Sequence, residues 1–263
     1  MKSTGIIPAR YGSNRFPGKP LAEIAGKSMI ERVYQRTAKT ESLHDVIVAT
    51  DDHRIKKEVE DFGGRAVMTD PGHSSGTDRI AEVAAGLDCE LVVNVQGDEP
   101  LIRPEMIEKA LRLLREDEKA VMSTLASPLS RKKIEDKNRV KVVRDRDGYA
   151  LYFSRAPIPS HPENSDPPGR EKSLAEPEGG PLLHIGMYVY RRDFLLDFTE
   201  LDPTPLEKCE SLEQLRALEN GCRIRVGVCE HHGPGVDRPG DIKSVEKLLA
   251  QEGITDDEEN KAE

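Results

Sequence analysis

The chain has 263 residues, of which 36% are hydrophobic and 33% are charged, and this composition predicts a folded α/β domain with a well-solvated surface. Its formal net charge of −9 at pH 7 disfavours general binding to nucleic acid or to an anionic membrane, but it leaves room for a local anion site. Aromatic residues make up only 4% of the chain and tryptophan is absent, which argues against a binding face built from stacked aromatic rings.

The first half of the chain alternates short apolar runs with amphipathic segments. The runs predict strands at Ser3–Pro8, Val46–Thr50, Arg65–Thr69, Leu91–Gln96 and Val121–Ala126, and the segments between them predict helices at Ser28–Thr40, His53–Phe62, Thr77–Ala85 and Pro104–Arg115. Runs as continuous as Val46–Val48 and Leu91–Val93 are typical of strands buried on both faces. This alternation predicts right-handed crossovers and a mostly parallel, Rossmann-like sheet.

The second half is less regular. We expect a hairpin of strands 140–144 and 150–154 around Asp147-Gly148, a long surface loop over Pro157–Pro181, a strand at Gly186–Arg191, a helix from Thr204 to about Asn220, a strand at Arg223–Val228 and a closing helix at Pro239–Gln251. The start of the helix after Thr204 is indicated by a capping-box pattern, with proline at the first helical position and Glu207 at the third.

The four cysteines form no CxxC pair, and the N-terminus has no signal-peptide pattern. We therefore expect reduced thiols in the cytoplasm. No apolar run approaches the length of about 20 residues that spans a bilayer, so no membrane association is expected.

The loop after the first expected strand, Pro8–Leu21, is the most informative segment. It holds Arg10, Arg15 and Lys19, with no acidic residue before Glu23. Arginine forms forked hydrogen bonds to phosphate oxygens and lysine adds a point charge, so this pattern predicts a polyphosphate site. A GxGxxG motif is absent, which disfavours a dinucleotide cofactor. The alternative is a solvated basic loop without function.

Two carboxylates are candidate metal ligands. Asp98 follows the expected strand Leu91–Gln96, and Asp237 precedes the proline that opens the last helix. Ligands bind beyond the carboxyl ends of parallel strands, and Mg²⁺ takes one or two carboxylates together with phosphate oxygens and water. The alternative for each aspartate is a turn or a helix cap.

Other candidates lie further along the chain. Ser75, Gly76 and Thr77 open a helix and could recognise a ribose or a base, or could simply start the helix. Glu207, Glu210 and Gln214 share a helix face at i, i+3, i+7 spacing and could bind sugar hydroxyls, although Glu207 also has a capping role. A lone histidine such as His184 is more often structural than catalytic.

The motifs as a set resemble one family. They are Pro8–Tyr11, Pro17–Pro20, Ser75–Arg79, Asn94–Pro100, Tyr149–Arg155, His184–Gly186, Pro205–Glu207, Leu212–Arg216 and Gly235–Asp237. In this order and spacing they resemble the 3-deoxy-manno-octulosonate cytidylyltransferases, or CMP-Kdo synthetases. The resemblance runs from about Thr4 to about Leu249. It implies a nucleotide-diphospho-sugar transferase fold, a homodimer, and a reaction of CTP with a 3-deoxy-2-ulosonic acid that needs Mg²⁺ and feeds lipopolysaccharide synthesis.

The resemblance also implies roles for individual residues. Arg10, Ser13, Arg15 and Lys19 would bind the CTP phosphates, with Arg10, Lys19 and Asp98 as the catalytic groups; Ser75, Gly76, Thr77 and Arg79 would contact the nucleotide; Asp98 and Asp237 would hold Mg²⁺; and Gln96, Arg155, His184, Tyr188, Glu210 and Gln214 would face the ulosonic acid. Asn14 and Phe16 replace the usual Thr and Leu of the first loop, and neither change removes a charge.

We therefore expect one nucleotidyltransferase domain over residues 1–252, followed by an acidic tail at 253–263. Residues 1–130 would form the nucleotide-binding half, and 131–235 a smaller sugar-binding and dimerisation part. The alternatives left open are a related ulosonic acid such as amino-Kdo or a sialic acid, a sugar-1-phosphate nucleotidyltransferase on the same fold, and a non-catalytic nucleotide-binding module.

Overall fold

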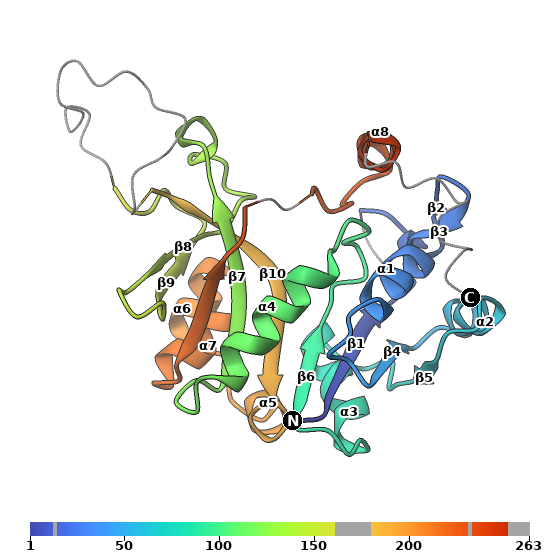
Figure 1. Cartoon of the computed structure of the whole chain (residues 1–263), viewed down its shortest axis with the longest axis horizontal. Helices are drawn as coiled ribbons and strands as arrows, with labels where there is room; N and C mark the ends of the chain where they lie inside the picture. The colour runs from blue at the N-terminus through green and yellow to red at the C-terminus, as the bar shows by residue number, and fades with distance from the viewer. Residues whose placement is uncertain (13–14, 161–179, 231–232, 252–263) are drawn as a thin grey trace.

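The computed structural model describes residues 1–12, 15–160, 180–230 and 233–251 (Figure 1). Ser13, most of the loop expected at 157–181 and the acidic tail therefore lie outside the described residues. The described part contains one large sheet and one two-stranded sheet, with the strands β1 Ser3–Ala9, β2 Glu23–Ile24, β3 Lys27–Ser28, β4 Asp45–Thr50, β5 Ala66–Met68, β6 Leu91–Asn94, β7 Met122–Pro128, β8 Lys141–Arg144, β9 Ala150–Ser154, β10 Leu182–Arg191 and β11 Ile224–Val228.

The main sheet has the order β11-β7-β10-β6-β1-β4-β5, and β8 and β9 extend it from β10. Strands β6, β1, β4 and β5 are mutually parallel, as predicted, and β11 is parallel to β7. Strand β10 runs antiparallel to both β6 and β7, so it joins the two parallel groups. The mostly parallel α/β sheet expected from the sequence is thus confirmed, with one reversed strand at its centre.

Helices cover both faces of this sheet. They are α1 Met29–Ala38, α2 His53–Asp61, α3 Gly76–Ala85, α4 Pro104–Arg115, α5 Arg192–Thr199, α6 Pro205–Glu210, α7 Gln214–Glu219 and α8 Ile242–Gln251, with 3₁₀ turns η1 Lys19–Leu21, η2 Arg131–Lys133 and η3 Pro239–Asp241. Alternate residues of the strands point to opposite faces, so Ile6 and Ile7 of β1 belong to different hydrophobic clusters. Among the described residues, no helix combines the length and apolar character needed to cross a membrane.

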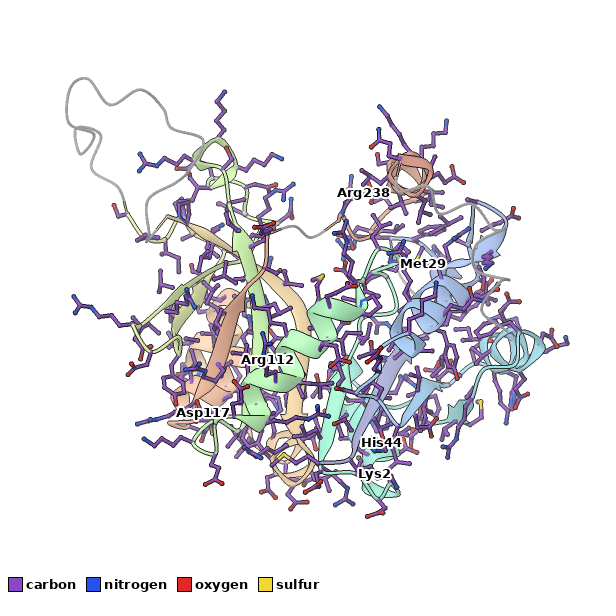
Figure 2. All side chains as sticks on the ribbon, viewed as in Figure 1. Lys2, Met29, His44, Arg112, Asp117 and Arg238 are labelled. Atoms are coloured by element: carbon purple, nitrogen blue, oxygen red, sulfur yellow. The ribbon has the colours of Figure 1, made fainter. Side chains whose placement is uncertain are left out.

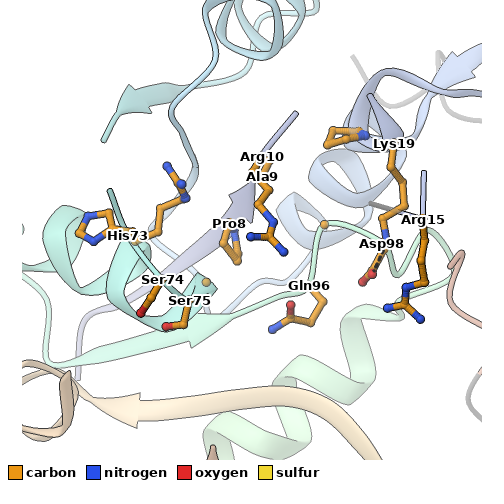
Figure 3. A pocket seen from close by; sticks show the side chains of 14 residues that line it. Pro8, Ala9, Arg10, Arg15, Lys19, His73, Ser74, Ser75, Gln96 and Asp98 are labelled. Atoms are coloured by element: carbon orange, nitrogen blue, oxygen red, sulfur yellow. Dashed lines mark hydrogen bonds and ion pairs between the residues drawn. The ribbon is translucent and has the colours of Figure 1, made fainter. Parts of the chain in front are cut away.

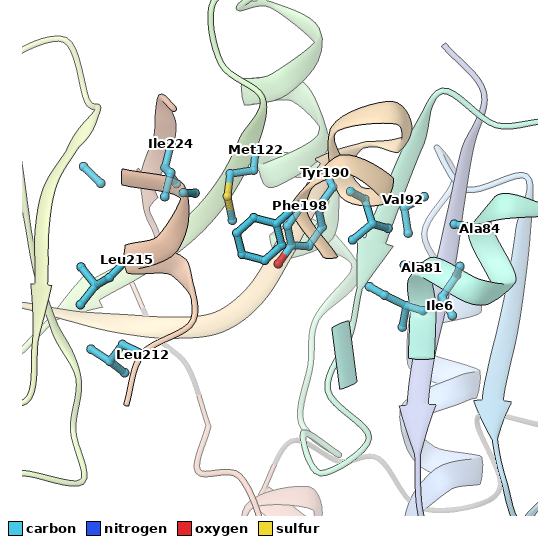
Figure 4. Packing of buried hydrophobic residues seen from close by; sticks show 14 of the residues in the cluster. Ile6, Ala81, Ala84, Val92, Met122, Tyr190, Phe198, Leu212, Leu215 and Ile224 are labelled. Carbon is cyan, nitrogen blue, oxygen red and sulfur yellow. The ribbon is translucent and has the colours of Figure 1, made fainter. Parts of the chain in front are cut away.

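One of these clusters connects the two halves of the chain (Figure 4). It extends from Ile6 and Val92 in the first half through Tyr190 of β10 to Leu215 and Ile224 in the second. Each of these five side chains is at most 2% exposed. The nucleotide-side and sugar-side parts expected from the sequence therefore share a continuous core.

The C-terminal segment returns to the first half of the chain. Val245 and Leu249 of α8 pack with Ile24 and Met29, and Ala25 donates a backbone hydrogen bond to Glu246 Oε1 at 3.1 Å. Figure 2 shows Arg238, which leads into α8, on the side of the molecule that carries Met29. This return brings residues 236–238 beside the loop that follows β1.

The second half differs from the sequence-based expectations in four places. The helix expected from Thr204 to Asn220 is two helices, α6 and α7, because Ser211 adopts a left-handed conformation with φ of 53°. The strand expected at Gly186 begins at Leu182, with an irregularity between Ile185 and Tyr188. Helix α5 was not expected, and the first turn of the closing helix is 3₁₀.

Candidate active site

A cavity of about 260 Å³ lies beyond the carboxyl ends of β1 and β6 (Figure 3). Its walls are formed by Pro8–Arg10, Arg15, Lys19, Pro20, His73–Gly76, Arg79 and Gln96–Asp98. Three of these residues, Arg10, Arg15 and Lys19, are called the loop cations below. In Figure 3 they lie along the upper and right-hand sides of the cavity, while Ser74 and Ser75 lie at the other end. The site therefore combines a cationic end with a hydroxyl-bearing end, at the edge of the sheet where ligands are expected.

Each of the two candidate metal carboxylates is paired with a loop cation. Lys19 Nζ lies 2.6 Å from Asp98 Oδ2 and donates to the carbonyl of Val236 at 3.0 Å. Arg15 Nη1 lies 3.2 Å from Asp237 Oδ2. A backbone hydrogen bond of 2.9 Å from Val236 N to Asp98 O joins the two loops that carry the aspartates. Asp98 thus lines the cationic end of the cavity, whereas Asp237 is not among the lining residues and adjoins the cavity through its pairing with Arg15.

These carboxylates have the chemistry that suits Mg²⁺. Within the described ranges no group of three or more His, Cys, Asp or Glu side chains is arranged to hold a metal. Two carboxylates on adjoining loops match an ion that takes few protein ligands and completes its shell with phosphate oxygens and water. The donor set therefore fits a metal that arrives with a polyphosphate.

The N-terminus of α3 forms the hydroxyl-bearing end of the cavity. Ser75 Oγ accepts a hydrogen bond from Asp78 N at 3.0 Å, and the Asp78 carboxylate accepts one from Ser75 N at 3.0 Å. This reciprocal cap fixes the entry to the helix, whose first backbone N–H groups favour negative charge nearby. A Cβ at Gly76 would lie 3.3 Å from Pro8 Cγ, so glycine allows the helix to approach the end of β1 closely.

Arg79 and Thr77 have partners within the protein. Arg79 is 3% exposed, and its Nη2 lies 2.7 Å from Asp51 Oδ2 while its Nη1 donates to the Thr69 hydroxyl. Thr77 does not line the cavity; its hydroxyl donates to Glu213 Oε2 at 2.6 Å. Arg79 therefore forms a fixed cationic wall, and Thr77 links α3 to the segment that leads into α7.

Of the residues expected to face a sugar, Gln96 lines the cavity and the other five do not. His184 Nε2 lies 3.1 Å from Thr124 Oγ1, and its ring contacts Phe153 and Tyr188 at centroid distances of 5.0 and 5.3 Å. Burial raises the pKa of the Tyr188 hydroxyl well above its ordinary value. Gln214 is 6% exposed, and its Nε2 has no hydrogen-bond partner among the described residues.

Hydrogen bonds link Arg155, which follows β9, to Glu210 at the end of α6. The Glu210 carboxylate accepts hydrogen bonds from Ser154 Oγ at 2.6 Å and Arg155 N at 2.9 Å. Arg155 Nε donates to the Glu210 carbonyl at 2.9 Å. The fully buried Lys141 donates to the Arg155 carbonyl at 2.5 Å, and loss of hydration lowers the pKa of this ammonium. These bonds join β9 to the end of α6.

Two further residues at or near the site, Glu213 and His73, received no role from the sequence motifs. Glu213 accepts the Thr77 bond and lies 3.7 Å from Arg216, and burial raises the pKa of its carboxyl. His73 lines the cavity and its Nε2 lies 2.5 Å from Glu82 Oε2. Their positions in the sequence could have indicated them, because Glu213 adjoins Gln214 and His73 precedes Ser75, the N-cap of α3, by two residues.

Comparisons with known proteins agree with this architecture. The cytidylyltransferase family model matches residues 4–224. The 3-deoxy-manno-octulosonate cytidylyltransferase of Syntrophotalea carbinolica is 55% identical over 251 residues, covering 95% of this chain and 99% of that protein. The enzyme of the same name from Geobacter sulfurreducens is 52% identical over 255 residues, covering 94% and 100%.

Solved structures give the same result. CMP:2-keto-3-deoxy-manno-octonic acid synthetase complexed with CTP matches with a TM-score of 0.88 and 43% identity, over 96% of this chain and 100% of that one. A 4-diphosphocytidyl-2C-methyl-D-erythritol synthase from Anaerococcus prevotii, 16% identical with a TM-score of 0.58 over 95% and 96% of the two chains, shares the fold. This chain belongs to the 3-deoxy-manno-octulosonate cytidylyltransferase family of nucleotidyltransferases.

Proposed function

We propose that this chain transfers CMP from CTP to 3-deoxy-D-manno-octulosonate (Kdo), giving CMP-Kdo and pyrophosphate for lipopolysaccharide synthesis. The observation that carries the proposal is the convergence of the loop cations with Asp98 around one cavity. The family membership supports it, since relatives named for this activity align with this chain over nearly their whole length. A triphosphate and a divalent cation are the ligands that such a charge arrangement suits.

The reaction needs positioned charge more than a covalent protein group. The oxygen of the C2 hydroxyl of Kdo bonds to the α-phosphorus of CTP, its proton passes to solvent, and the bond from that phosphorus to the pyrophosphate oxygen breaks. We assign the loop cations to the phosphates that leave, where they neutralise the developing negative charge. Ser75, Gly76 and Arg79 would contact the nucleotide from the other end of the cavity, and Thr77 would act through Glu213.

We further propose that Asp98 and Asp237 hold Mg²⁺. When bound, the ion would neutralise phosphate charge and lower the pKa of the attacking hydroxyl. The pairing of both carboxylates with loop cations supports this assignment, because each carboxylate already lies beside the groups assigned to phosphate. Two carboxylates are also the number of protein ligands that Mg²⁺ commonly takes.

The sugar is assigned to the space between Gln96 and the β10–α7 region. The buried amide nitrogen of Gln214 supports this, because it is a donor without a partner among the described residues and such groups are costly to leave unpaired. His184 and Tyr188 would line the same region. Arg155 and Glu210 would form its outer wall, since their hydrogen bonds fix β9 against α6.

We propose that the enzyme acts as a homodimer in the cytoplasm. Two of the exposed large hydrophobic side chains in the described residues, Leu151 and Leu206, lie on β9 and α6 in the part assigned to dimerisation. All four cysteines carry free thiols, which reducing compartments maintain. Light scattering at several protein concentrations would test the dimer, and a monomer throughout would contradict it.

Pyrophosphate release tests the reaction. The purified chain should release pyrophosphate with CTP, Mg²⁺ and Kdo together, and release should stop when any one of them is omitted. Kdo, its amino analogue and a sialic acid, assayed side by side, would identify the ulosonic acid used. No release with any of the three would overturn the proposal.

A further inference from the structure

We propose that Arg54, outside the cavity, is a positioning residue that holds the phosphate-binding loop in shape by covering the ring of Tyr11. This inference rests on the proposed function, because it concerns how the loop cations are presented to a nucleotide. It gives Arg54 and Tyr11 a role in the affinity for CTP and none in the recognition of the sugar.

The loop is closed at its base by Tyr11 and Gly18. Gly18 N donates to the Tyr11 carbonyl at 2.9 Å. Tyr11 directly follows Arg10, and Gly18 directly precedes Lys19. Gly18 has φ of 71°, and a Cβ there would lie 3.1 Å from the Cε2, Cζ and Oη atoms of Tyr11. The Tyr11 ring therefore lies directly against the Gly18 backbone, so the position of the ring affects both cationic ends of the loop.

Arg54 covers the same ring. Its guanidinium carbon lies 3.3 Å from the Tyr11 ring centroid, which is a close cation–π contact. Arg54 belongs to α2, and α2 packs against η1, the turn that contains Lys19. The contact thus ties the loop to a helix of the main fold.

Asp52 fixes the guanidinium in place and balances its charge. Arg54 Nε donates to Asp52 Oδ1 at 2.9 Å and Nη2 donates to Oδ2 at 2.6 Å. Asp52 Oδ1 also accepts the Arg54 backbone N–H at 2.9 Å, as the N-cap of α2. The side-chain hydrogen bonds from Arg54 lower the pKa of Asp52 to about 2, so this carboxylate stays charged. Arg54 can therefore cover the ring without adding net positive charge beside the loop cations.

The physical need for such a contact follows from the charge of the loop. In this structure Asp98 and Asp237 offset the mutual repulsion of the loop cations by pairing with Lys19 and Arg15. If a metal ion takes up these carboxylates, the repulsion returns and favours an open loop. A loop that must be ordered on binding loses affinity, and one that is held beforehand keeps it. Asp51 and Asp52, consecutive at the end of β4, each fix one arginine: Asp51 holds Arg79 in the cavity wall, and Asp52 holds Arg54 behind the loop.

The test compares three variants with a matched control. Arg54→Ala and Tyr11→Leu should each raise KM for CTP about two- to fivefold, the size expected for one lost cation–π contact at an exposed arginine, while KM for Kdo stays unchanged. Tyr11→Phe keeps the ring and should match the wild type. Lys57→Ala, an exposed position on the same helix, is the control and should also match it.

A double variant distinguishes positioning from direct contact with the nucleotide. If Arg54 acts through Tyr11, Arg54→Ala combined with Tyr11→Leu raises KM for CTP no further than the larger single effect. Multiplied effects, equal increases in both KM values, or an unchanged KM for CTP in Arg54→Ala would each overturn the proposal.

Two measurements need no sugar, so they separate this proposal from the reaction itself. Calorimetry should show weaker CTP binding to Arg54→Ala, and amide hydrogen exchange should be faster at Gly18, whose N–H bonds to Tyr11, but unchanged in α2. If the wild type turns over no ulosonic acid, the proposed function fails while these measurements still decide the role of Arg54. Wild-type exchange at Gly18 in Arg54→Ala would reject that role.

Discussion

Lys19 Nζ lies 2.6 Å from Asp98 Oδ2, so the cation assigned to phosphate and the carboxylate assigned to metal neutralise each other in this structure. Arg15 and Asp237 repeat the relationship at 3.2 Å. A metal ion at the carboxylates and a polyphosphate at the cations would replace both pairs together. Mg²⁺ should therefore raise the affinity for the nucleotide, and the nucleotide should raise the affinity for Mg²⁺ by the same factor.

The first prediction concerns Asp98→Asn. Turnover should fall about 100-fold or more, because the variant loses one of the two carboxylates proposed to hold Mg²⁺ beside the transferring phosphate. In EDTA the same variant should bind CTP more tightly than the wild type, since Lys19 no longer has an anionic partner. Stopped-flow turnover and calorimetry would measure the two effects. Near-normal turnover by a folded variant would remove Asp98 from the metal role.

Arg15→Ala should weaken the use of CTP while leaving the stability of the fold almost unchanged. The Arg15–Asp237 pair is exposed, at 64% and 55% of the two side chains, so its loss should change the free energy of unfolding by less than about 0.5 kcal/mol. KM for CTP should rise and depend less steeply on salt, because one phosphate contact is lost. Urea unfolding and KM values at two ionic strengths would check this. A large loss of stability would instead make Arg15 structural.

The Thr77–Glu213 hydrogen bond predicts a contrast between two substitutions. Glu213→Ala leaves the buried Thr77 hydroxyl without its acceptor and should lower the free energy of unfolding by about 1–3 kcal/mol. Glu213→Gln keeps an acceptor oxygen and removes a carboxylate whose pKa burial has raised, so it should cost less. Chemical denaturation of the two variants would test this order, and equal losses would contradict it.

Asp52 predicts a pH dependence of stability. Its pKa is lowered from an ordinary 3.8 to about 2, so the folded state binds this proton less readily than the unfolded state does. The resulting stabilisation is complete above pH 3.8 and is lost as the pH falls towards 2. The difference in unfolding free energy between the wild type and Arg54→Ala should therefore shrink from pH 5 to pH 3. A constant difference would show that the pair does not shift this pKa.

The strands and the rim of the site were predictable because their signals are local. The continuous apolar runs Val46–Val48 and Leu91–Val93 indicated strands buried on both faces, and β4 and β6 occupy them. Parallel strands share one carboxyl edge, so Arg10 and Asp98 were expected at the same rim, and both line the cavity.

The second half was harder to predict because its local signals compete. Thr204–Glu207 correctly indicated where α6 begins, and Glu207 accepts a bond from Thr204 N at 3.2 Å. Nothing in the helical pattern showed that Ser211 would take a left-handed conformation and split the expected helix. The direction of β10 also depends on its two neighbours, β6 and β7, rather than on its own residues.

The sequence alone determined the family, the cationic loop and the residue types of the site, because these depend on which side chains follow which strands. The tertiary structure decided which of them meet. Arg15 and Asp237 are 222 residues apart in the chain, and they pair because α8 packs its apolar face on Ile24 and Met29. The same long-range packing sets Thr77 against Glu213. Such contacts follow from burying apolar surface between distant segments, which local sequence patterns do not encode.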